Sequence, residues 1–347
     1  MTCFRDILKQ YWNYDSFRPL QEDIISSIYD GKDTLGLMPT GGGKSLTFQV
    51  PTLLMDGICI VITPLIALMK DQVDNLKQKG IKANMIHSGM SRNEIVIALE
   101  NCIFGNYKFL YVSPERLSND LFLAKLQDMN VCMIAVDESH CISQWGYDFR
   151  PAYLKIADLR NLLPETPVLA LTATATPTVI DDIQEKLLFK EKNVFRKSFE
   201  RANIAYIIRR TEDKLFELIK ILQKTQGSGI VYVRSRKKTK EIAEELQLRG
   251  ISADFFHAGL NFDEKAKKQN NWKTNQCRII VCTNAFGMGI DKPNVRIIIH
   301  YELPGSLEEY FQEAGRAGRD EKKAYAVALY SNHDSGLLKR RIKDEFP

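Results

Sequence analysis

The stretch Thr40-Gly41-Gly42-Gly43-Lys44-Ser45 decides how this chain folds. Residues 33 to 38 before it are mostly apolar and predict a short buried strand, and residues 46 to 50 after it predict the start of a helix. A strand, a glycine loop and a helix N-terminus together form a geometry that holds a phosphate chain. The stretch therefore predicts a nucleotide site, with Lys44 on the β- and γ-phosphates and the Ser45 hydroxyl as a Mg²⁺ ligand.

The loop departs from the strict pattern G-x-x-x-x-G-K-[ST], because Met38 stands where the first glycine is expected. A glycine-rich surface turn is therefore the alternative for this stretch taken alone. The glycines favour the nucleotide interpretation, since they let backbone N–H groups approach phosphate oxygens without a Cβ in the way.

Length and composition indicate an ordinary globular protein with two domains. The chain has 347 residues, of which 44% are hydrophobic and 26% are charged. Residues 1 to 11 mix charged and apolar side chains, unlike a signal peptide, and the longest apolar run, 58 to 69, is interrupted by Pro64. We therefore expect a cytoplasmic protein, nucleoid-associated if bacterial, with no segment in a membrane.

Cysteine spacing and charge give two further expectations. The seven cysteines form no C-x-x-C pair, which favours reduced, buried thiols and no zinc site in this chain. Residues 201–347 carry 27 Lys and Arg against 19 Asp and Glu, a net charge of +8, whereas residues 1–200 carry 21 against 24, a net charge of −3. The basic second half indicates a polyanionic partner, although solvated basic faces explain the charge equally well.

Apolar runs alternate with helical stretches in the first half and predict a doubly wound parallel sheet. Strands are predicted at 58–63, 109–112, 132–136 and 168–171, and helices at 21–29 and 65–79. In such α/β folds, ligand sites lie at the carboxyl ends of the strands. A polar cluster follows each of these strands, and the cluster after the third is Asp137-Glu138-Ser139-His140.

The carboxylates Asp137 and Glu138 end an apolar strand, where desolvation is costly without a cation. Together with the glycine loop, they predict Asp137 as a second Mg²⁺ ligand. Glu138 is then the group that orients and deprotonates the attacking water. The alternative interpretation is a helix N-cap with an acidic first turn.

Near residue 200 the pattern restarts and predicts a second α/β domain without a glycine-lysine loop. Strands are predicted at 230–233, 253–256, 278–282 and 296–300, and helices at 239–247 and 307–314. We therefore divide the chain into domains 1–200 and 201–347. Past the last helix, Arg316 and Arg319 are flanked by small residues, which suits a close approach to phosphate.

Residues 143 to 151 carry alternating aromatic side chains: Trp145, Tyr147 and Phe149. Aromatics at this spacing are more often the core of a strand, but Gly146 and Pro151 argue against a regular strand here. Exposed aromatics stack on nucleic-acid bases, and Arg150 beside them would reach a phosphate or the nucleotide site.

The motifs together resemble the helicase core of superfamily 2 and, within it, the RecQ family of DNA helicases, over the whole chain. The motifs that carry the resemblance are FRPLQ at 17–21, MPTGGGKS at 38–45, TPLIALMKDQ at 63–72, DESHCISQWGYDFRP at 137–151, ALTATA at 170–175, HAGL at 257–260, TNAFGMGIDKPNVR at 283–296 and QEAGRAGR at 312–319. The segment from 143 to 151 is the specific one, because the other motifs indicate only a nucleic-acid-stimulated ATPase.

The resemblance implies two RecA-like, doubly wound parallel-sheet lobes in tandem, with the nucleotide site in the cleft between them. It implies an ATP-dependent 3′→5′ DNA helicase or translocase that uses Mg²⁺ and acts in DNA repair and recombination. Its implied partners are single-stranded and forked DNA, and we expect a monomer.

The resemblance also implies roles for individual residues. Those for binding adenine are Tyr14, Arg18 and Gln21. Those for catalysis are Lys44, Asp137, Glu138, His140, Gln312, Arg316 and Arg319, the last two as arginine fingers. Those for DNA binding and its coupling to hydrolysis are Ser143, Gln144, Trp145, Tyr147, Phe149, Arg150, Thr172 and Thr174.

Two departures from the family pattern qualify these expectations. Ser139 stands where the family usually has Ala or Val, and the 347 residues of this chain do not include the family's zinc-binding and winged-helix region. We therefore expect weaker duplex binding than a longer relative shows. The alternatives are a DEAD-box-like RNA helicase, a DNA-stimulated ATPase unable to unwind without further domains, and a non-catalytic binding module with a relic ATPase. The last is disfavoured because Lys44, Asp137 and Glu138 are all present.

Overall fold

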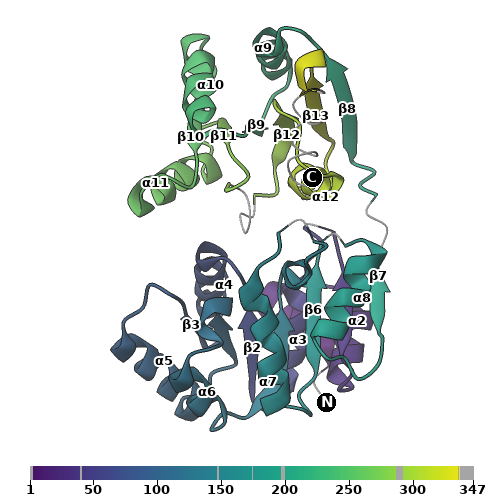
Figure 1. Ribbon diagram of the computed structural model, residues 1–347, viewed down its shortest axis with the longest axis vertical. Coiled ribbons are helices and arrows are strands. Elements are labelled where there is room, and N and C mark those ends of the chain that lie inside the picture. The colour runs from purple at the N-terminus through teal and green to yellow at the C-terminus, as the bar shows by residue number, and fades with distance from the viewer. Residues whose placement is uncertain are drawn as a thin grey trace. The chain divides into compact units, whose positions relative to one another are not determined.

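The computed structural model describes residues 3–39, 41–146, 148–173, 175–196, 200–286, 292–334 and 336. The chain divides into two compact units, residues 1–199 and 200–347, which we call lobe 1 and lobe 2 (Figure 1). Among the described residues, each lobe has one sheet, and all neighbouring strands in it run parallel.

Lobe 1 contains a seven-stranded sheet within its described residues, in the order β3-β4-β2-β5-β6-β1-β7. The strands are β1 Thr34–Leu37, β2 Ile58–Ile62, β3 Ala83–Ile86, β4 Phe109–Val112, β5 Val131–Val136, β6 Val168–Thr172 and β7 Val194–Arg196. The helices are α1 Phe4–Trp12, α2 Gln21–Tyr29, α3 Leu46–Leu54, α4 Ile66–Gln78, α5 Arg92–Phe104, α6 Asp120–Leu126, α7 Ile156–Leu162 and α8 Pro177–Lys186.

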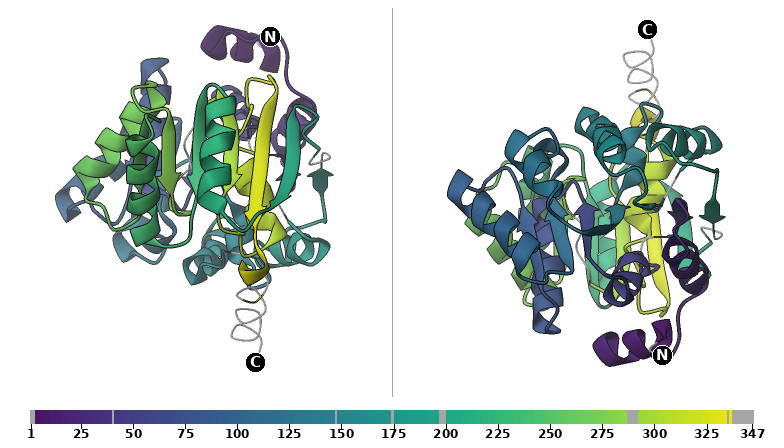
Figure 2. Two further views of the ribbon diagram at one scale, coloured as in Figure 1. Left: turned by 90° about the horizontal axis from the view of Figure 1, so that it is seen from above. Right: turned by 90° about the horizontal axis from the view of Figure 1, so that it is seen from below.

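Helices cover both faces of the lobe 1 sheet because side chains alternate along each strand. Ile60 of β2 packs in the cluster that contains side chains from α5 to α8, and its neighbour Val61 packs in the cluster formed with α2, α3 and α4. Helix α1 packs against α3 at the edge of the lobe, where Leu8 and Val50 share a small separate cluster (Figure 2).

Lobe 2 contains a six-stranded sheet within its described residues, in the order β10-β11-β9-β12-β13-β8. Its strands are β8 Ile204–Arg210, β9 Ser228–Tyr232, β10 Ala253–Phe256, β11 Ile279–Cys282, β12 Val295–His300 and β13 Ala324–Tyr330. Its helices are α9 Lys214–Lys224, α10 Arg236–Leu248, α11 Phe262–Lys273 and α12 Leu307–Ala314. Leu218 and Leu246 place α9 and α10 on one face, and Trp272 and Ala314 place α11 and α12 on the other.

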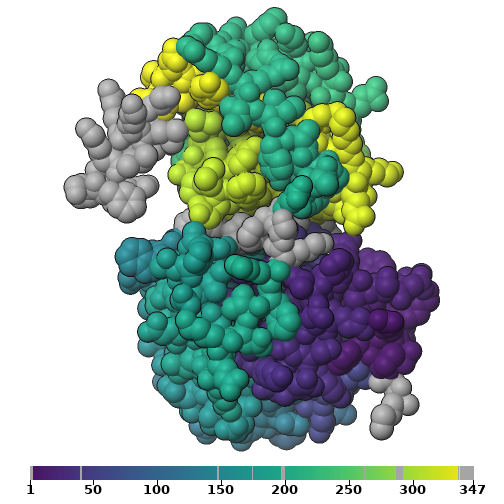
Figure 3. Space-filling view, turned by 90° about the vertical axis from the view of Figure 1, so that its right-hand side faces the viewer, coloured from purple at the N-terminus to yellow at the C-terminus, as the bar shows by residue number. Residues whose placement is uncertain are grey.

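The amino ends of the lobe 1 strands are held by a buried polar network around Asp33. Its carboxylate accepts hydrogen bonds from Arg160 Nη2 at 2.7 Å and from the backbone N–H groups of Val168 and Lys190, each at 2.9 Å. Nearby, Asn193 donates to the Ser27 hydroxyl at 2.9 Å, so α2 and the segment before β7 lie side by side (Figure 3). The polar groups at the amino edge of the sheet are thus hydrogen-bonded to one another. The polar residues at the carboxyl edge are therefore the candidates for a ligand site.

The two-lobed α/β prediction is confirmed, and several predicted elements have the observed bounds. The helices at 21–29 and 307–314 and the strand at 253–256 match α2, α12 and β10. The strands β3, β7, β8 and β13 are absent from the sequence prediction. Strand β3 is short and contains Asn84, and every second residue at the start of β13 is alanine, which has low strand propensity. None of the described helices has both the length and the apolar character required to cross a membrane.

Candidate nucleotide and nucleic-acid site

The glycine loop lies between β1 and α3, as the sequence predicts. Gly41 and Gly43 have φ values of +79° and +78°, a backbone conformation that residues with a side chain rarely adopt. A Cβ on Gly42 would lie 2.8 Å from the Pro39 carbonyl oxygen, so all three glycines are required by the backbone path. Ser45 occupies the N-cap position of α3, and the loop therefore leads its N–H groups to a helix N-terminus.

Arg18 and Gln21 lie against this loop rather than apart from it. Gln21 is buried at the start of α2, and its Nε2 donates to the carbonyl oxygens of Gly43 at 3.0 Å and Gly42 at 3.4 Å. The Arg18 guanidinium donates to the Gly41 carbonyl oxygen. Tyr14 has 54% of its surface exposed, which leaves its ring available for stacking. Of the three residues predicted to bind adenine, Arg18 and Gln21 therefore contact the glycine loop, and Tyr14 is exposed to solvent.

Asp137 and Glu138 follow β5 directly, at the carboxyl edge of the sheet. Asp137 is only 7% exposed, and its backbone carbonyl accepts a hydrogen bond from the Tyr153 hydroxyl at 2.9 Å. Glu138 has φ +49° and ψ +45°, the left-handed region, where a residue with a side chain is strained by about 1–2 kcal/mol. Such strain is concentrated at functional sites, because the surrounding structure must hold it in place.

Burial and the neighbouring charge of Glu138 raise the pKa of Asp137, and Lys44 opposes this shift only in part. Lys44 therefore lies close to Asp137, although β6 separates β5 from β1 in the sheet. A buried carboxylate with a raised pKa is a group that gains from a cation. The Asp137 carboxylate and the Ser45 hydroxyl supply oxygen ligands, the type that Mg²⁺ prefers, so the residues present fit this metal.

His140 connects the carboxylate pair to the next strand. Its Nδ1 lies 2.8 Å from the Thr172 hydroxyl at the end of β6 and 3.5 Å from Glu138 Oε2. Burial lowers the pKa of His140 and outweighs the charges of Glu138 and Asp148, which act to raise it, so the neutral ring is favoured. His140, predicted to be catalytic, and Thr172, predicted to couple DNA binding to hydrolysis, are therefore in direct contact.

The segment after His140 folds as turns and short 3₁₀ helices, at Ser139–Ile142 and Pro151–Lys155, and the described residues between them form no strand. Trp145 is 74% exposed, whereas Ser143 is buried and Phe149 is half-buried. Gln144 is exposed beside Trp145. A Cβ on Gly146 would lie 2.7 Å from the His140 carbonyl oxygen, so this glycine permits the turn that presents Trp145.

The Arg150 side chain forms hydrogen bonds with other residues of lobe 1. It donates to Asp148 Oδ2 from Nη2 at 3.0 Å and from Nε at 3.2 Å, and to the Pro64 carbonyl oxygen from Nη1 at 3.4 Å. These bonds tie the aromatic segment to the residues that follow β2. His140, Cys141 and Asp148 place potential metal-ligand atoms within 4.8 Å of one another. Burial raises the pKa of the Cys141 thiol, and Asp148 already pairs with Arg150, so this cluster does not suit a metal ion.

The predicted lobe 2 residues lie on α12 and the turn after it. Gln312 and Arg316 are buried, at 8% and 6% exposed, and Arg319 is half-buried. A side-chain hydrogen bond joins Arg316 to Tyr232 at the end of β9. The His300 ring at the end of β12 bonds Glu313 at 2.9 Å.

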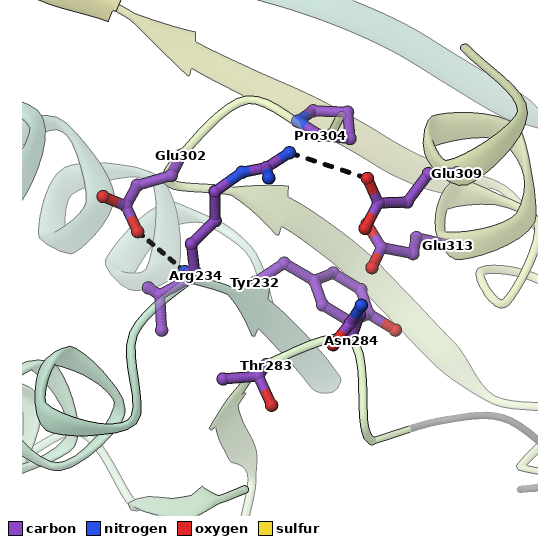
Figure 4. A pocket seen from close by; sticks show the side chains of 9 residues that line it. Tyr232, Arg234, Thr283, Asn284, Glu302, Pro304, Glu309 and Glu313 are labelled. Atoms are coloured by element: carbon purple, nitrogen blue, oxygen red, sulfur yellow. Dashed lines mark hydrogen bonds and ion pairs between the residues drawn. The ribbon is translucent and has the colours of Figure 1, made fainter. Parts of the chain in front are cut away.

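A cavity of about 100 Å³ opens beside these groups in lobe 2 (Figure 4). Its lining side chains include Tyr232, Arg234, Asn284, Glu302 and Glu309. Arg234 points across it toward Glu309, at 3.6 Å, while its backbone N–H donates to Glu302 (Figure 4). The cavity is polar and follows the carboxyl ends of β9, β11 and β12.

Three predicted site residues, Thr40, Tyr147 and Thr174, lie outside the described residues. One contact at the site is absent from the sequence prediction, the hydroxyl of Tyr153 on Asp137. The signal that would have indicated it is a tyrosine two residues after Pro151, on a short helix that returns to the strand end.

Comparisons with known families agree with this arrangement. Residues 18–183 match the model of the DEAD/DEAH box helicase family, and residues 212–321 match that of the helicase conserved C-terminal domain. The chain is 42% identical over 350 residues to the probable ATP-dependent DNA helicase RecS of Bacillus subtilis. The matched region covers 99% of this chain and 70% of that protein.

The chain is also 42% identical over 340 residues to the ATP-dependent DNA helicase RecQ of Haemophilus influenzae, covering 98% of this chain but 55% of that protein. The chain therefore spans only about half of that relative. A crystal structure of the DUF1998 helicase MrfA bound to DNA matches with a TM-score of 0.80 at 18% identity, covering 99% of this chain and 53% of the other. At that identity the match concerns the fold alone.

Proposed function

The chain belongs to the RecQ family of ATP-dependent DNA helicases, and from this premise we propose that it is a DNA-stimulated ATPase that moves 3′→5′ along single-stranded DNA. The observation that carries the proposal is in lobe 1. There, one sheet edge holds the glycine loop, the Asp137-Glu138 pair and, through His140, the segment that exposes Trp145. The residues proposed for hydrolysis and the residue proposed to contact nucleic acid are thus connected through His140.

In this proposal the groups of lobe 1 divide the work on ATP. Lys44 stabilises charge on the β- and γ-phosphates, and the glycine N–H groups bind phosphate oxygens. Ser45 and Asp137 would hold Mg²⁺, which would supply positive charge beside the phosphates. Glu138, fixed in its strained conformation, orients the attacking water and accepts its proton.

Coupling runs through His140 in this proposal. A base stacked on Trp145 shifts the segment 143–150, which begins three residues after His140. His140 contacts both Glu138 and Thr172, so a shift of its ring changes the position of the carboxylate. Hydrolysis is therefore slow without DNA and faster with it.

Lobe 2 contributes Gln312, Arg316 and Arg319, which we assign to the γ-phosphate, where guanidinium groups stabilise the charge of the transition state. Its basic charge suits the phosphate backbone of DNA, with affinity that falls as salt rises. We place the protein in DNA repair or recombination, in the compartment that holds DNA.

The test is steady-state ATP hydrolysis, titrated separately with single-stranded DNA and single-stranded RNA. Strong stimulation by DNA and little by RNA is the expected result. Arg316→Ala is expected to lower kcat at least about 1000-fold if it acts as an arginine finger. Equal stimulation by both nucleic acids would contradict the DNA assignment, and a wild-type kcat in Arg316→Ala would remove the finger assignment.

A DEAD-box-like RNA helicase is the second candidate, favoured by the match of residues 18–183 to the DEAD/DEAH box family. Stimulation by RNA alone would support it. A third outcome concerns unwinding, since the chain spans 55% of its RecQ relative. DNA-stimulated hydrolysis without strand separation on a forked duplex would identify a translocase that needs further domains to unwind.

A further inference from the structure

The turn that carries Arg316 and Arg319 begins at the carboxyl end of α12, where backbone carbonyl groups have no partner within the helix. Arg201 donates to the carbonyl of the C-cap residue and to two carbonyls of the turn beyond it. Its Nη1 donates to the Gly315 carbonyl oxygen at 3.3 Å, and its Nη2 donates to the carbonyl oxygens of Ala317 at 3.2 Å and Gly318 at 2.9 Å. One guanidinium therefore holds the backbone on both sides of Arg316.

Asn203 reinforces the same turn. Its Nδ2 donates to the carbonyl oxygens of Gly318 at 2.8 Å and Lys322 at 3.0 Å, and its Oδ1 accepts from Arg201 Nε at 3.4 Å. Gly318 has φ +54°, and a Cβ there would lie 2.5 Å from Asn203 Nδ2. The turn thus has the glycine that this close approach requires.

Arg201 and Asn203 are themselves fixed to the sheet. The backbone N–H of Ile204, the first residue of β8, donates to the Arg201 carbonyl oxygen at 2.9 Å, and the N–H of Ala324 in β13 donates to the Asn203 carbonyl oxygen at 2.9 Å. The turn is therefore anchored to two neighbouring strands.

We propose that Arg201 is a positioning residue for hydrolysis, which sets the backbone from Gly315 to Arg319 so that both arginines reach the phosphate. The inference rests on the proposed function, because it gives the Arg201 contacts a role in turnover. The competing explanation is that Arg201 only stabilises the end of α12, since a cation at a helix carboxyl end is favourable in any protein.

Lobe 2 contains a matched control for that explanation. Arg278, which precedes β11, donates to the carbonyl oxygens of Leu222 at 2.7 Å and Gly227 at 2.9 Å, and also to that of Thr225. It therefore holds the end of α9 as Arg201 holds the end of α12. Arg278 lies before the amino end of its strand, away from the residues assigned to the phosphate.

The experiment compares Arg201→Met with Arg278→Met in the full chain, measured as kcat and KM for ATP with saturating single-stranded DNA. We expect Arg201→Met to lower kcat by about tenfold to a hundredfold with little change in KM, because a small displacement of a catalytic group has an effect of this size. Arg278→Met is expected to lower the Tm by about as much as Arg201→Met does, but to keep the wild-type kcat. Arg201→Lys, which keeps the charge but loses the fork, is expected to recover only part of kcat.

A double-variant cycle separates positioning from general damage. In an Arg316→Ala, Arg319→Ala background, adding Arg201→Met is expected to cause no further loss of kcat. Amide hydrogen exchange in residues 315–319 is expected to rise in Arg201→Met and stay unchanged in Arg278→Met. An equal loss in both backgrounds, an unchanged exchange rate or a wild-type kcat in Arg201→Met would each overturn the inference.

The same series separates this inference from the proposed function. If Arg316→Ala and Arg319→Ala together leave kcat at the wild-type value, the assignment of these arginines fails and the role of Arg201 fails with it. If those variants are inactive and Arg201→Met is fully active, only the inference fails.

Discussion

Six of the seven described strands of lobe 1 follow the same order as the six of lobe 2, but the loops at the carboxyl edge differ. The orders β3-β4-β2-β5-β6-β1 and β10-β11-β9-β12-β13-β8 coincide when β1 is matched with β8, β2 with β9 and so on along the chain. Strand β1 leads into the glycine loop, whereas β8 leads into Thr211-Glu212-Asp213, where Asp213 caps α9 by accepting from the Phe216 N–H at 2.9 Å. The same sheet thus carries a glycine loop in one lobe and a simple helix cap in the other.

Carboxylates follow both β5 and β12, Asp137 as the first residue after β5 and Glu302 as the second after β12, and the two have opposite electrostatic environments. Burial and Glu138 raise the pKa of Asp137. Burial also acts to raise the pKa of Glu302, but its bonds with Lys238 and the Arg234 N–H outweigh this, so the pKa of Glu302 is lowered. The lobe 2 carboxylate pairs with Lys238, whereas we propose that the lobe 1 pair receives its cation together with the nucleotide.

Other features are shared, and these belong to the scaffold. Strands β3 and β10 are both followed by a His-x-Gly turn, at His87 and His257, and then by a helix that starts with a capping box. Burial and a nearby arginine, Arg116 or Arg236, lower the pKa of each histidine. The comparison indicates that chemistry in this fold is decided by a few loops on a repeated sheet.

The largest expected difference between the lobes concerns the lysine after β1 and the lysine after β8. Lys44→Ala is expected to reduce ATP turnover about 1000-fold, because it removes charge stabilisation at the phosphates. Lys214→Ala is the control, since Lys214 donates to the Tyr301 carbonyl oxygen at 2.9 Å and pairs with Asp334 at 2.7 Å. Steady-state hydrolysis measures both variants. Full turnover in Lys44→Ala would contradict the loop assignment.

The second comparison tests the carboxylates two residues after β5 and β12. Glu138→Gln is expected to slow turnover about 100-fold or more, because glutamine cannot accept the proton of water. Binding of a fluorescent ATP analogue is expected to persist. Glu302→Gln, at the matching place in lobe 2, is expected to keep most of the turnover. Equal losses in the two variants would mean that the lobes share the hydrolytic role.

The aromatic segment has no counterpart after β12, where only residues 301–306 lie between the strand and α12. Trp145→Ala is expected to raise the DNA concentration for half-maximal stimulation about tenfold, as expected for the loss of one stacked base. Hydrolysis without DNA is expected to stay near the wild-type rate. Phe104→Ala is the control, because Phe104 is 80% exposed on α5 without such a role. Loss of basal and stimulated rates together would mean that Trp145 is a structural residue.

The opposite pKa shifts predict opposite effects on stability. The pKa of Glu302 is lowered in the folded state, so its pairing stabilises the fold above the ordinary carboxyl pKa and is lost as pH falls. Glu302→Gln is therefore expected to lower Tm by about 2–4 °C near pH 7 and by less near pH 4.

The pKa of Asp137 is raised, so its ionisation destabilises the folded state at neutral pH. Asp137→Asn is expected to raise Tm by about 2–4 °C near pH 7 and to have little effect near pH 4, where Asp137 is protonated. Thermal unfolding at the two pH values measures both variants. Shifts of the same sign in Asp137→Asn and Glu302→Gln would refute the electrostatic contrast.

The smallest expected effect concerns Ser139, whose lobe 2 counterpart is the apolar Leu303. Ser139 is fully buried, and its hydroxyl has no hydrogen-bond partner within the described part of the chain. Ser139→Ala is expected to raise the free energy of unfolding by about 1 kcal/mol, because an unpaired buried hydroxyl is destabilising. Urea unfolding measures the change, with ATP turnover unaffected. A loss of stability would indicate that this hydroxyl has a partner.

Local patterns were sufficient for much of the fold and for part of the site. Apolar runs predict β2 and β5, and the glycines predict the loop after β1, because strand burial and positive φ depend on residue type at each position. The strands β3 and β13 escape prediction because their residues have weak local preferences. They become strands by pairing with β4 and with β12 and β8.

The sequence by itself determined the class of fold, the glycine loop, the position of the carboxylate pair and, through its motifs, the helicase family. Tertiary structure alone decided which of these groups touch. His140 meets Thr172 across 32 residues, and Arg201 meets Gly318 across 117 residues. The physical reason is that strand order and register, not local sequence, set which strand ends become neighbours. Contacts such as the hydrogen bonds from Arg201 to the turn after α12 therefore leave no local sequence pattern that could predict them.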